Sequence, residues 1–359
     1  MRASTLSIQH QYIDRDAGRV CDERIYGDGL VRWLYSEVRE NAPALYRLAL
    51  SPRVSGLLGF INYDLPLGGV ISGSRRFLRE NGVNLEECVE RPEALNTMRK
   101  VFERRIRYWD CRPLPPEGNA VLSPADARVL VGSFDESSAL FLKGKFFDFE
   151  ELLGRGKTDW LDSFAGGDFA VFRLTPDKYH YNHTPAAGEV RDFYEVRGRR
   201  HACNPSAVVT EVTPYSKNTR TVTVIDTDVE GGSQIGLVAM IEVTALMIGE
   251  VLQCYSRERY DSPQPITVGM FVERGCPKSL YRPGSSADVL LFQRGRVIFD
   301  GDLIDNLRRH DAQSRFSQGF GRPLVETEVT ARSRIAIANS NKESFISRSD
   351  ALKLSKHAT

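Results

Sequence analysis

The chain has 359 residues, enough to bury a core in one large domain with an accessory region, or in two modest domains. Its 48 lysines and arginines balance 47 aspartates and glutamates, which leaves a net charge of +1. A general nucleic-acid binder usually shows a marked basic excess, so this composition argues against that class. An anionic partner must therefore bind at a local cluster of basic residues. Six scattered cysteines without a CxxC pair make no disulfide scaffold and favour a reducing compartment.

The N-terminal sequence shows no sign of secretion. Residues 1–20 lack a basic start followed by an apolar run and lack a small-residue cleavage site, so we expect the protein in the cytoplasm. Residues 54–71 are apolar, but Asn62, Asp64 and Pro66 interrupt them, and a spanning helix needs about 20 mostly apolar residues. This stretch can form a core hairpin or lie on a bilayer surface.

Residues 27–107 show a helical pattern. Apolar side chains recur at steps of three and four, which places them on one helix face: Leu30, Trp33, Leu34 and Val38, and more loosely Leu45, Leu48 and Leu50. The run RPLPPEGNA that follows contains three prolines and a glycine and indicates a connector at 112–118. We therefore predict a helical region over residues 1–111.

Beyond the connector, short apolar runs rich in Val, Ile, Phe and Thr alternate with turn residues. Such runs predict strands at 129–131, 169–174, 207–212, 221–225, 237–244, 289–292 and 296–299. A β-rich domain over residues 112–338 follows from this pattern. Residues 339–359 are polar without a clear core face, and we predict a flexible tail.

Two places in this β-rich part hold residues typical of acid–base chemistry. Asp126 ends the motif SPAD in a turn before an apolar strand, where an aspartate often only accepts backbone N–H groups. His180 and His183 lie three residues apart in DKYHYNHTP, and histidine suits proton transfer near neutral pH, unless the pair is simply a surface turn. His180 and His183 with His201 and Cys203 match no common zinc spacing, so we predict no metal.

A third place is the turn YRPGSSADVLLF. Gly284 and Ser285 follow a proline and precede an apolar strand. Taken alone, Pro-Gly-Ser-Ser is ordinary turn chemistry. The three places gain meaning from their order along the chain.

In this order the motifs resemble those of the phosphatidylserine decarboxylase family over roughly residues 80–338. The resemblance is carried by three segments: SPAD at 123–126, GGDFAVFRLTPDKYHYNHTP at 166–185 and GSSADVLLF at 284–292. Weaker matches support it: KGKFFDFEELLG at 143–154, CNPSAV at 203–208 and GRVIFDGDL at 295–303. The resemblance implies an α+β fold, with an N-terminal helical region followed by a mainly β catalytic domain.

The family's chemistry carries over to matching residues. The resemblance implies self-cleavage between Gly284 and Ser285, with Asp126 and His183 completing a Ser-His-Asp triad that activates the serine hydroxyl. Attack of Ser285 Oγ on the Gly284 carbonyl converts the peptide bond to an ester. Elimination releases the upstream chain and leaves a dehydroalanine, which hydrolyses to an N-terminal pyruvoyl group and ammonia.

The resemblance also implies the reaction that follows self-cleavage. The pyruvoyl ketone forms a Schiff base with the amine of phosphatidylserine and takes up the electrons left by carbon dioxide, which yields phosphatidylethanolamine without a bound organic cofactor. His180 matches the histidine of the decarboxylation step and returns a proton to the α-carbon, for which a pKa near neutrality is favourable.

Two departures from the family pattern concern the site. Ala127 replaces a glycine after the SPAD aspartate, a small change. VGMF at 268–271 is separated from Gly284 by an insertion at 272–283, beside the reaction centre. The insertion can reshape the substrate pocket, so it bears on the substrate more than on self-processing.

Three functions remain open. The leading one acts on phosphatidylserine as a peripheral protein on the cytoplasmic face of a membrane, through residues 54–71 and the nearby arginines Arg47, Arg53, Arg75 and Arg76. The second is a soluble pyruvoyl-dependent decarboxylase of a free amino acid. The third is a non-catalytic binding protein of the same fold. The family also implies a homodimer.

Overall fold

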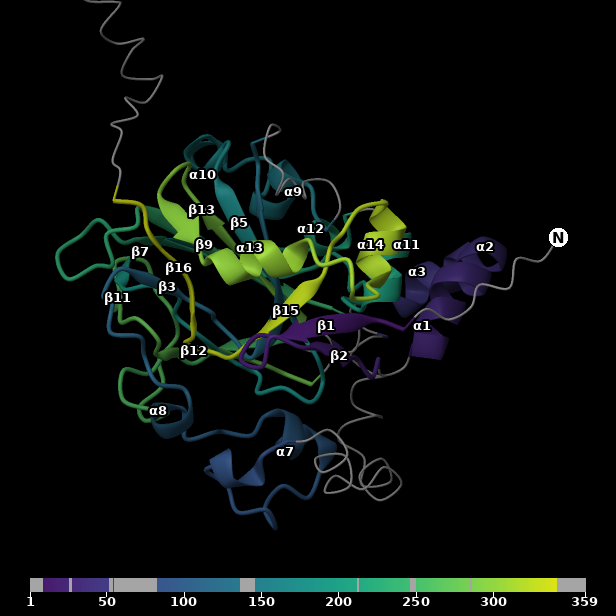
Figure 1. Cartoon of the computed structure of the whole chain (residues 1–359), viewed down its shortest axis with the longest axis horizontal. Helices are drawn as coiled ribbons and strands as arrows, with labels where there is room; N and C mark the ends of the chain where they lie inside the picture. Colours follow the sequence, from purple (N-terminus) through teal and green to yellow (C-terminus); the bar gives the residue numbers. More distant parts are fainter. Residues whose placement is uncertain are drawn as a thin grey trace, which may run out of the picture.

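A sheet of ten strands forms the centre of the protein (Figure 1). The computed structural model describes residues 9–25, 28–51, 54, 83–135, 146–211, 213–245, 250–283 and 286–340. In spatial order, the strands are β11 (Phe271–Val272), β7 (Gly188–Val196), β8 (Arg220–Asp226), β9 (Leu237–Thr244), β13 (Ser286–Phe292), β5 (Asp168–Leu174), β4 (Ala127–Ser133), β15 (Glu326–Val329), β1 (Gln11–Asp14) and β2 (Val20–Asp22). Neighbours pair antiparallel, except that β1 runs parallel to β15.

Two small sheets complete the β structure. One has the order β10 (Val251–Gln253), β12 (Pro277–Tyr281) and β6 (Tyr181–His183), and the other β14 (Val297–Phe299), β16 (Arg334–Ala338) and β3 (Ala120–Leu122). Both are antiparallel. In the first of them, His183 ends β6 and His180 directly precedes it, and β12 beside β6 leads toward residue 284.

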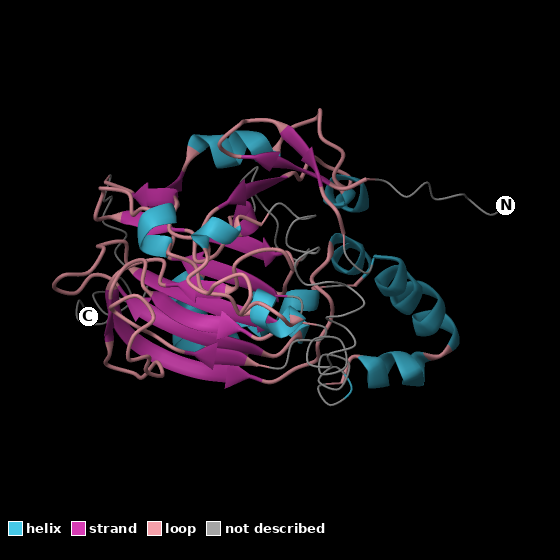
Figure 2. Cartoon of the chain, turned by 90° about the horizontal axis from the view of Figure 1, so that it is seen from below, coloured by secondary structure: helices cyan, strands magenta, loops and turns pink. Residues whose placement is uncertain are grey.

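The helices are short and lie around the sheets. They are α1 (Asp28–Trp33), η1 (Leu34–Val38), α2 (Arg39–Asn41), α3 (Pro43–Ala49), η2 (Leu85–Glu87), α7 (Met98–Phe102), α8 (Tyr108–Cys111), α9 (Phe149–Leu153), α10 (Thr158–Phe164), α11 (Pro205–Thr210), α12 (Pro214–Lys217), α13 (Gly301–Leu307) and α14 (Arg315–Phe320). Helices α1–α3 lie at one end of the molecule, opposite β7 and β11 (Figures 1 and 2). No helix within the described ranges is long and apolar enough to cross a membrane.

The large sheet is buried on both faces, which explains why its strands read as nearly continuous apolar runs. On β13, Ala287, Val289 and Leu291 belong to one core with side chains of α9, α10, α11 and α14. Leu290 and Phe292 belong to a second core with side chains of β14, β16 and α13. A strand between two cores has no face for polar residues, so polar side chains at its start call for an explanation.

The strands predicted at 129–131, 169–174, 221–225, 237–244, 289–292 and 296–299 are confirmed, the last as a shorter strand. The strand predicted at 207–212 is wrong, because α11 occupies this position. Asn204 caps the helix by accepting from Ala207 N at 2.9 Å, and Pro205 stands at its first turn, where its fixed φ favours a helix.

The N-terminal region is partly as predicted. Helices form at 28–49 with Leu34 and Val38 buried, whereas Trp33, Leu45 and Leu48 are more than half exposed instead of facing a core. The region also contributes β1 and β2 to the large sheet, which the helical prediction did not include. Residues 55–71 and 341–359 lie outside the described residues, so both predictions made for them stay predictions.

Candidate active site

Asp126 lies in the bend between β3 and β4 and is 7% exposed. The Arg112 guanidinium contacts both carboxylate oxygens, with Nε 3.0 Å from Oδ1 and Nη2 2.8 Å from Oδ2, and Ala331 N donates to Oδ1 at 2.8 Å. Burial opposes ionisation, but the charge and hydrogen bonds of Arg112 outweigh it and lower the pKa of Asp126. Asp126 is therefore a fixed, ionised carboxylate and more than a local turn cap.

His183, the last residue of β6, is held on both sides of its ring. Its backbone N donates to Pro124 O at 2.7 Å, which ties β6 to the SPAD motif. Its Nδ1 lies 2.9 Å from Gly275 O, and its Nε2 lies 3.0 Å from the Tyr179 hydroxyl. Because a carbonyl only accepts, Nδ1 carries the proton and Nε2 is the basic nitrogen. Burial lowers the pKa of His183 to about 4, so the ring is neutral at pH 7.

Asp126 and His183 lie close in the fold but do not share a hydrogen bond. The Asp126 oxygens bind Arg112 and Ala331, and the ring nitrogens of His183 face Gly275 and Tyr179. The negative charge of Asp126 nevertheless favours the protonated form of His183. Asp126 can thus stabilise an imidazolium through its charge, and the Ser-His-Asp triad stays a prediction.

His180 is fully buried, and neither of its ring nitrogens has a hydrogen-bond partner within the described part of the chain. The ring stacks on Phe102 with centroids 3.5 Å apart, and the His180 carbonyl accepts from Tyr281 N at 3.1 Å. Burial, followed by the charge of Arg104, holds the pKa of His180 well below its ordinary 6.5. The surface-turn interpretation of the two histidines is therefore wrong. The near-neutral pKa expected for His180 is not found either, because its ring is desolvated.

The predicted cleavage site, Gly284 and Ser285, lies outside the described residues. Its flanks are described: Tyr281 ends β12, and Ser286 begins β13, which pairs along its whole length with β5 and β9. Among the described residues, neither ring nitrogen of His180 has a hydrogen-bond partner. Buried polar atoms are normally satisfied, so this imidazole fits a site for a polar reacting group such as a pyruvoyl carbonyl.

The segment predicted as an insertion, 272–283, is part of the wall of this site. It forms the end of β11 and all of β12, the middle strand of its sheet. Gly275 O faces the ring of His183, and Tyr281 N binds the carbonyl of His180. The segment therefore positions both histidines of the predicted site.

The structure adds residues that sequence reasoning missed. Arg112, which fixes Asp126, opens the proline-rich connector and was read only as part of a boundary. Phe102 and Tyr281 carry no local signal, because their contacts with His180 join segments far apart in sequence. Tyr179 lies four residues before His183 in the motif DKYHYNHTP, where the sequence alone gave it no role. In the described part of the chain, the one group of His, Cys and acidic ligand atoms within 4.8 Å of one another is His10, Glu23 and Glu326. The zinc set of His180, His183, His201 and Cys203 is thus not brought together.

The depressed pKa of His183 predicts a specific pH dependence of stability. Between pH 6.5 and 4 the unfolded chain binds a proton at this position that the folded chain does not, so the free energy of unfolding decreases as the pH falls through this window. In His183→Gln the side-chain amide can still donate to Gly275 O. Between pH 7 and 4.5, we expect the free energy of unfolding of this variant to decrease by about 2–3 kcal/mol less than that of the parent chain. Urea unfolding of both chains in a Ser285→Ala background measures this. Equal pH dependence in the two chains would contradict the assignment.

Comparison with known proteins agrees with this geometry. The family model for phosphatidylserine decarboxylase matches residues 98–319. The phosphatidylserine decarboxylase proenzyme of Bordetella petrii is 31% identical over 235 residues, which are 62% of this chain and 78% of the relative. The proenzyme of Chlamydia trachomatis is 26% identical over 317 residues, 87% of this chain and 96% of the relative. That of Fusobacterium nucleatum is 24% identical, with 82% and 91% covered.

The chain belongs to the phosphatidylserine decarboxylase family. The family predicted from the ordered motifs is confirmed, and with it the enzyme class, a carboxy-lyase of phospholipid biosynthesis made as a proenzyme. The cofactor prediction is confirmed at the same level, because family membership implies a serine-derived pyruvoyl group. The predicted reaction, phosphatidylserine to phosphatidylethanolamine, is that of the family.

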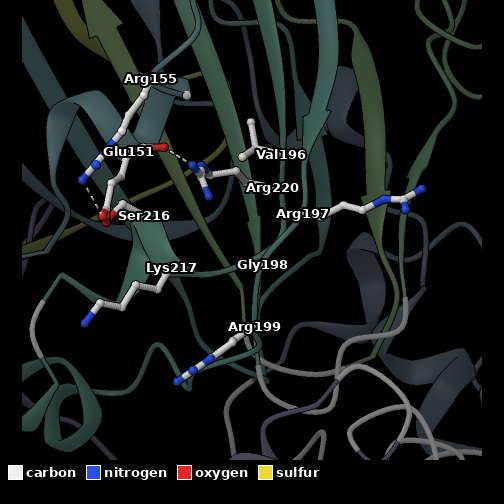
Figure 3. Close-up of a pocket in the computed structure, with 10 residues that line it drawn as sticks. Glu151, Arg155, Val196, Arg197, Gly198, Arg199, Ser216, Lys217 and Arg220 are labelled. Carbon is white, nitrogen blue, oxygen red and sulfur yellow. Dashed lines mark hydrogen bonds and ion pairs between the residues drawn. The ribbon is translucent and has the colours of Figure 1, made fainter.

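This phosphatidylserine decarboxylase family member also has a basic pocket away from the histidines. It has a volume of about 530 Å³ and lies beside the end of β7, α9 and α12 (Figure 3). Five cationic side chains and one acid line it: Arg155, Arg197, Arg199, Lys217, Arg220 and Glu151. Lys217 Nζ donates to Glu211 Oε1 at 3.0 Å, and the Tyr46 hydroxyl on α3 donates to the other oxygen of Glu211 at 3.2 Å. The pocket therefore adjoins the N-terminal helices.

Proposed function

We propose that the chain cuts its own backbone between Gly284 and Ser285 and then decarboxylates phosphatidylserine to phosphatidylethanolamine. The observation that carries this proposal is the buried imidazole of His180, whose ring nitrogens have no partner among the residues that the structure describes. The backbone carbonyl of His180 accepts from Tyr281 N, three residues before Gly284. Family membership and the order of the three motifs support the same reaction. The division into a helical region 1–111, a catalytic domain 112–338 and a tail 339–359 is part of this proposal, as is a homodimer.

In the self-cleavage step, His183 is the base that takes the proton of Ser285 Oγ. The neutral imidazole that burial enforces has a free electron pair at Nε2, now facing the Tyr179 hydroxyl. Asp126, kept ionised by Arg112, stabilises the imidazolium that forms. Ser285 Oγ then attacks the Gly284 carbonyl, and the amide nitrogen of Ser285 leaves with a proton.

In the decarboxylation step, His180 is a base first and an acid afterwards. A pyruvoyl group formed from Ser285 would supply a ketone able to condense with the substrate amine and to withdraw electrons from the α-carbon. The amine arrives as an ammonium ion, and a neutral His180 can take its proton. The imidazolium formed in this buried place has a strong tendency to give the proton up, and it returns the proton to the α-carbon once carbon dioxide has left.

Contact with a lipid surface through the N-terminal helices is the second part of the proposal. Trp33 on α1 and Leu45 and Leu48 on α3 are 52%, 52% and 55% exposed, and aromatic and leucine side chains are those that enter the interface of a bilayer. The basic pocket, joined to α3 through Glu211, adds a site for anionic headgroups. Arg47 lies on α3, whereas Arg53, Arg75 and Arg76 lie outside the described residues.

Turnover of phosphatidylserine in vesicles against turnover of free serine tests the substrate. We expect the purified, cleaved protein to sediment with vesicles of phosphatidylserine and phosphatidylcholine and to produce phosphatidylethanolamine there. Vesicles of phosphatidylcholine alone control for binding that does not depend on charge, and they should bind less protein because the basic pocket then finds no net negative surface. Absence of binding together with decarboxylation of free amino acids would refute the lipid substrate in favour of the soluble alternative.

A further inference from the structure

Tyr281 joins the two sides of the proposed cut. It is the last residue of β12, and its hydroxyl donates to the carbonyl of Ala287 in β13 at 2.9 Å. The same hydroxyl lies 2.7 Å from Asp288 Oδ1, and all three residues are fully buried. Cleavage between Gly284 and Ser285 would place Tyr281 on the upstream fragment and Ala287 and Asp288 on the downstream fragment.

The Tyr281 hydroxyl reaches two acceptors on β13. It is the donor in both contacts, and its one proton is shared between the Ala287 carbonyl at 2.9 Å and Asp288 Oδ1 at 2.7 Å. Burial, followed by the charge of Glu242 across the ladder, raises the pKa of Asp288 well above its ordinary value, and the hydrogen bond from Tyr281 acts in the opposite direction. The contact therefore requires only an acceptor oxygen on the side chain at position 288.

The strand that carries Tyr281 is fixed to the large sheet by a buried ion pair. Lys278 Nζ on β12 lies 2.7 Å from Glu242 Oε2 on β9, and both side chains are fully buried. The Ser279 hydroxyl donates to the other oxygen of Glu242. Asn182 Nδ2 on β6 lies 3.1 Å from Glu242 Oε1 and 3.3 Å from Asp288 Oδ1. A shift of β12 would break an ion pair that water cannot replace, so the Tyr281 ring stays in place.

The backbone N–H of Tyr281 also bonds to His180, the residue proposed for the decarboxylation step. Its N–H donates to the His180 carbonyl at 3.1 Å, while its hydroxyl fixes Ala287. Only Ser285 and Ser286 stand between the proposed cut and Ala287. Tyr281 thus links the backbone of His180 to the start of β13.

We propose that Tyr281, through Ala287 and Asp288, is a positioning residue that ties β12 to β13 across the proposed cut, in the proenzyme and in the cleaved enzyme. This inference rests on the proposed cut between Gly284 and Ser285. It assigns to β12 a role in both reactions, because the same bonds fix the two strands on either side of the reacting residues.

Tyr281→Phe tests the proposal by removing only the hydroxyl. Tyr215→Phe is the matched control, because Tyr215 is also fully buried but its hydroxyl has no partner in the described structure. We expect Tyr281→Phe to slow self-cleavage, followed on denaturing gels, by about 10- to 100-fold, the usual penalty for a reacting group displaced by a fraction of an ångström to one ångström. In the cleaved enzyme, kcat should fall by a similar factor while KM for phosphatidylserine stays within about twofold.

Asp288→Asn distinguishes loss of the hydrogen bond to Tyr281 from loss of packing. The asparagine side-chain oxygen can accept from the Tyr281 hydroxyl as the carboxyl oxygen does, so this variant should cleave within about threefold of the wild-type rate. Asp288→Ala should be as slow as Tyr281→Phe.

The results distinguish a failure of the proposed function from a failure of the positioning role of Tyr281. Wild type and Tyr215→Phe that both stay uncut would refute the proposed function, and this inference with it. If both are cut and Tyr281→Phe is cut equally fast, only the positioning role is refuted. An Asp288→Asn variant as slow as Asp288→Ala would show that an acceptor for the Tyr281 hydroxyl is not sufficient, which also contradicts the proposal.

Discussion

Ser285→Ala is expected to remain a single polypeptide of 40.4 kDa on a denaturing gel, whatever the length of incubation. Alanine has no hydroxyl to attack the Gly284 carbonyl, so neither the ester nor the later elimination can form, and no decarboxylase activity should appear. Loss of a catalytic nucleophile commonly costs several orders of magnitude in rate, so the uncut chain should persist for days.

Ser286→Ala is the matched control for this variant. Ser286 is the neighbouring serine at the start of β13, and its buried hydroxyl has no partner in the described structure, so its removal breaks no bond there. We expect normal cleavage in Ser286→Ala. Cleavage in the Ser285 variant, or loss of cleavage in the Ser286 variant alone, would show that a residue other than Ser285 is the nucleophile.

His180→Ala is expected to separate the two reactions. The chain should still cut itself, because His183 and Asp126 remain, but turnover of phosphatidylserine should fall by about 10²–10⁴, the usual contribution of a general acid–base group. Gels measure the first property, and release of carbon dioxide from labelled substrate measures the second. Near-normal turnover in His180→Ala would remove the role we give to this imidazole.

The cavity left by His180→Ala needs its own control. Phe102, which stacks on His180, loses its neighbour in this variant, and part of the effect could come from repacking. Phe102→Leu removes the stacking and keeps the imidazole. We expect this variant to retain most of its turnover, and a loss as large as that of His180→Ala would assign the effect to packing instead of proton transfer.

Most strands of the large sheet could be predicted from the sequence, because a strand buried on both faces is a continuous run of apolar residues. Strands β5, β8, β9 and β13 are apolar runs bounded by turn residues. The first three were placed within one residue, whereas β13 begins three residues before the predicted 289–292. The run 207–212 looked the same but forms a helix, because Asn204 and Pro205 set its start and outweigh the β-branched valines. Strand β1 escaped prediction because its partner, β15, lies some 300 residues away in the chain.

The site was predictable only in part, and for a similar reason. Asp126, His180 and His183 stand in motifs whose order identifies the family. Their environment depends on pairs that no motif contains: Arg112 with Asp126, Gly275 with His183, and Phe102 with His180. These contacts explain why both histidines are neutral, a property that residue types and spacing do not give.

Mass spectrometry of the smaller fragment of the purified wild-type protein tests the central claim most directly, since it reports the position of the cut and the chemistry of the new N-terminus together. We predict a fragment that begins at residue 285, lighter by one ammonia than the same peptide with an N-terminal serine, and reducible by borohydride. An intact chain, or a fragment with an ordinary amino terminus, would contradict the account.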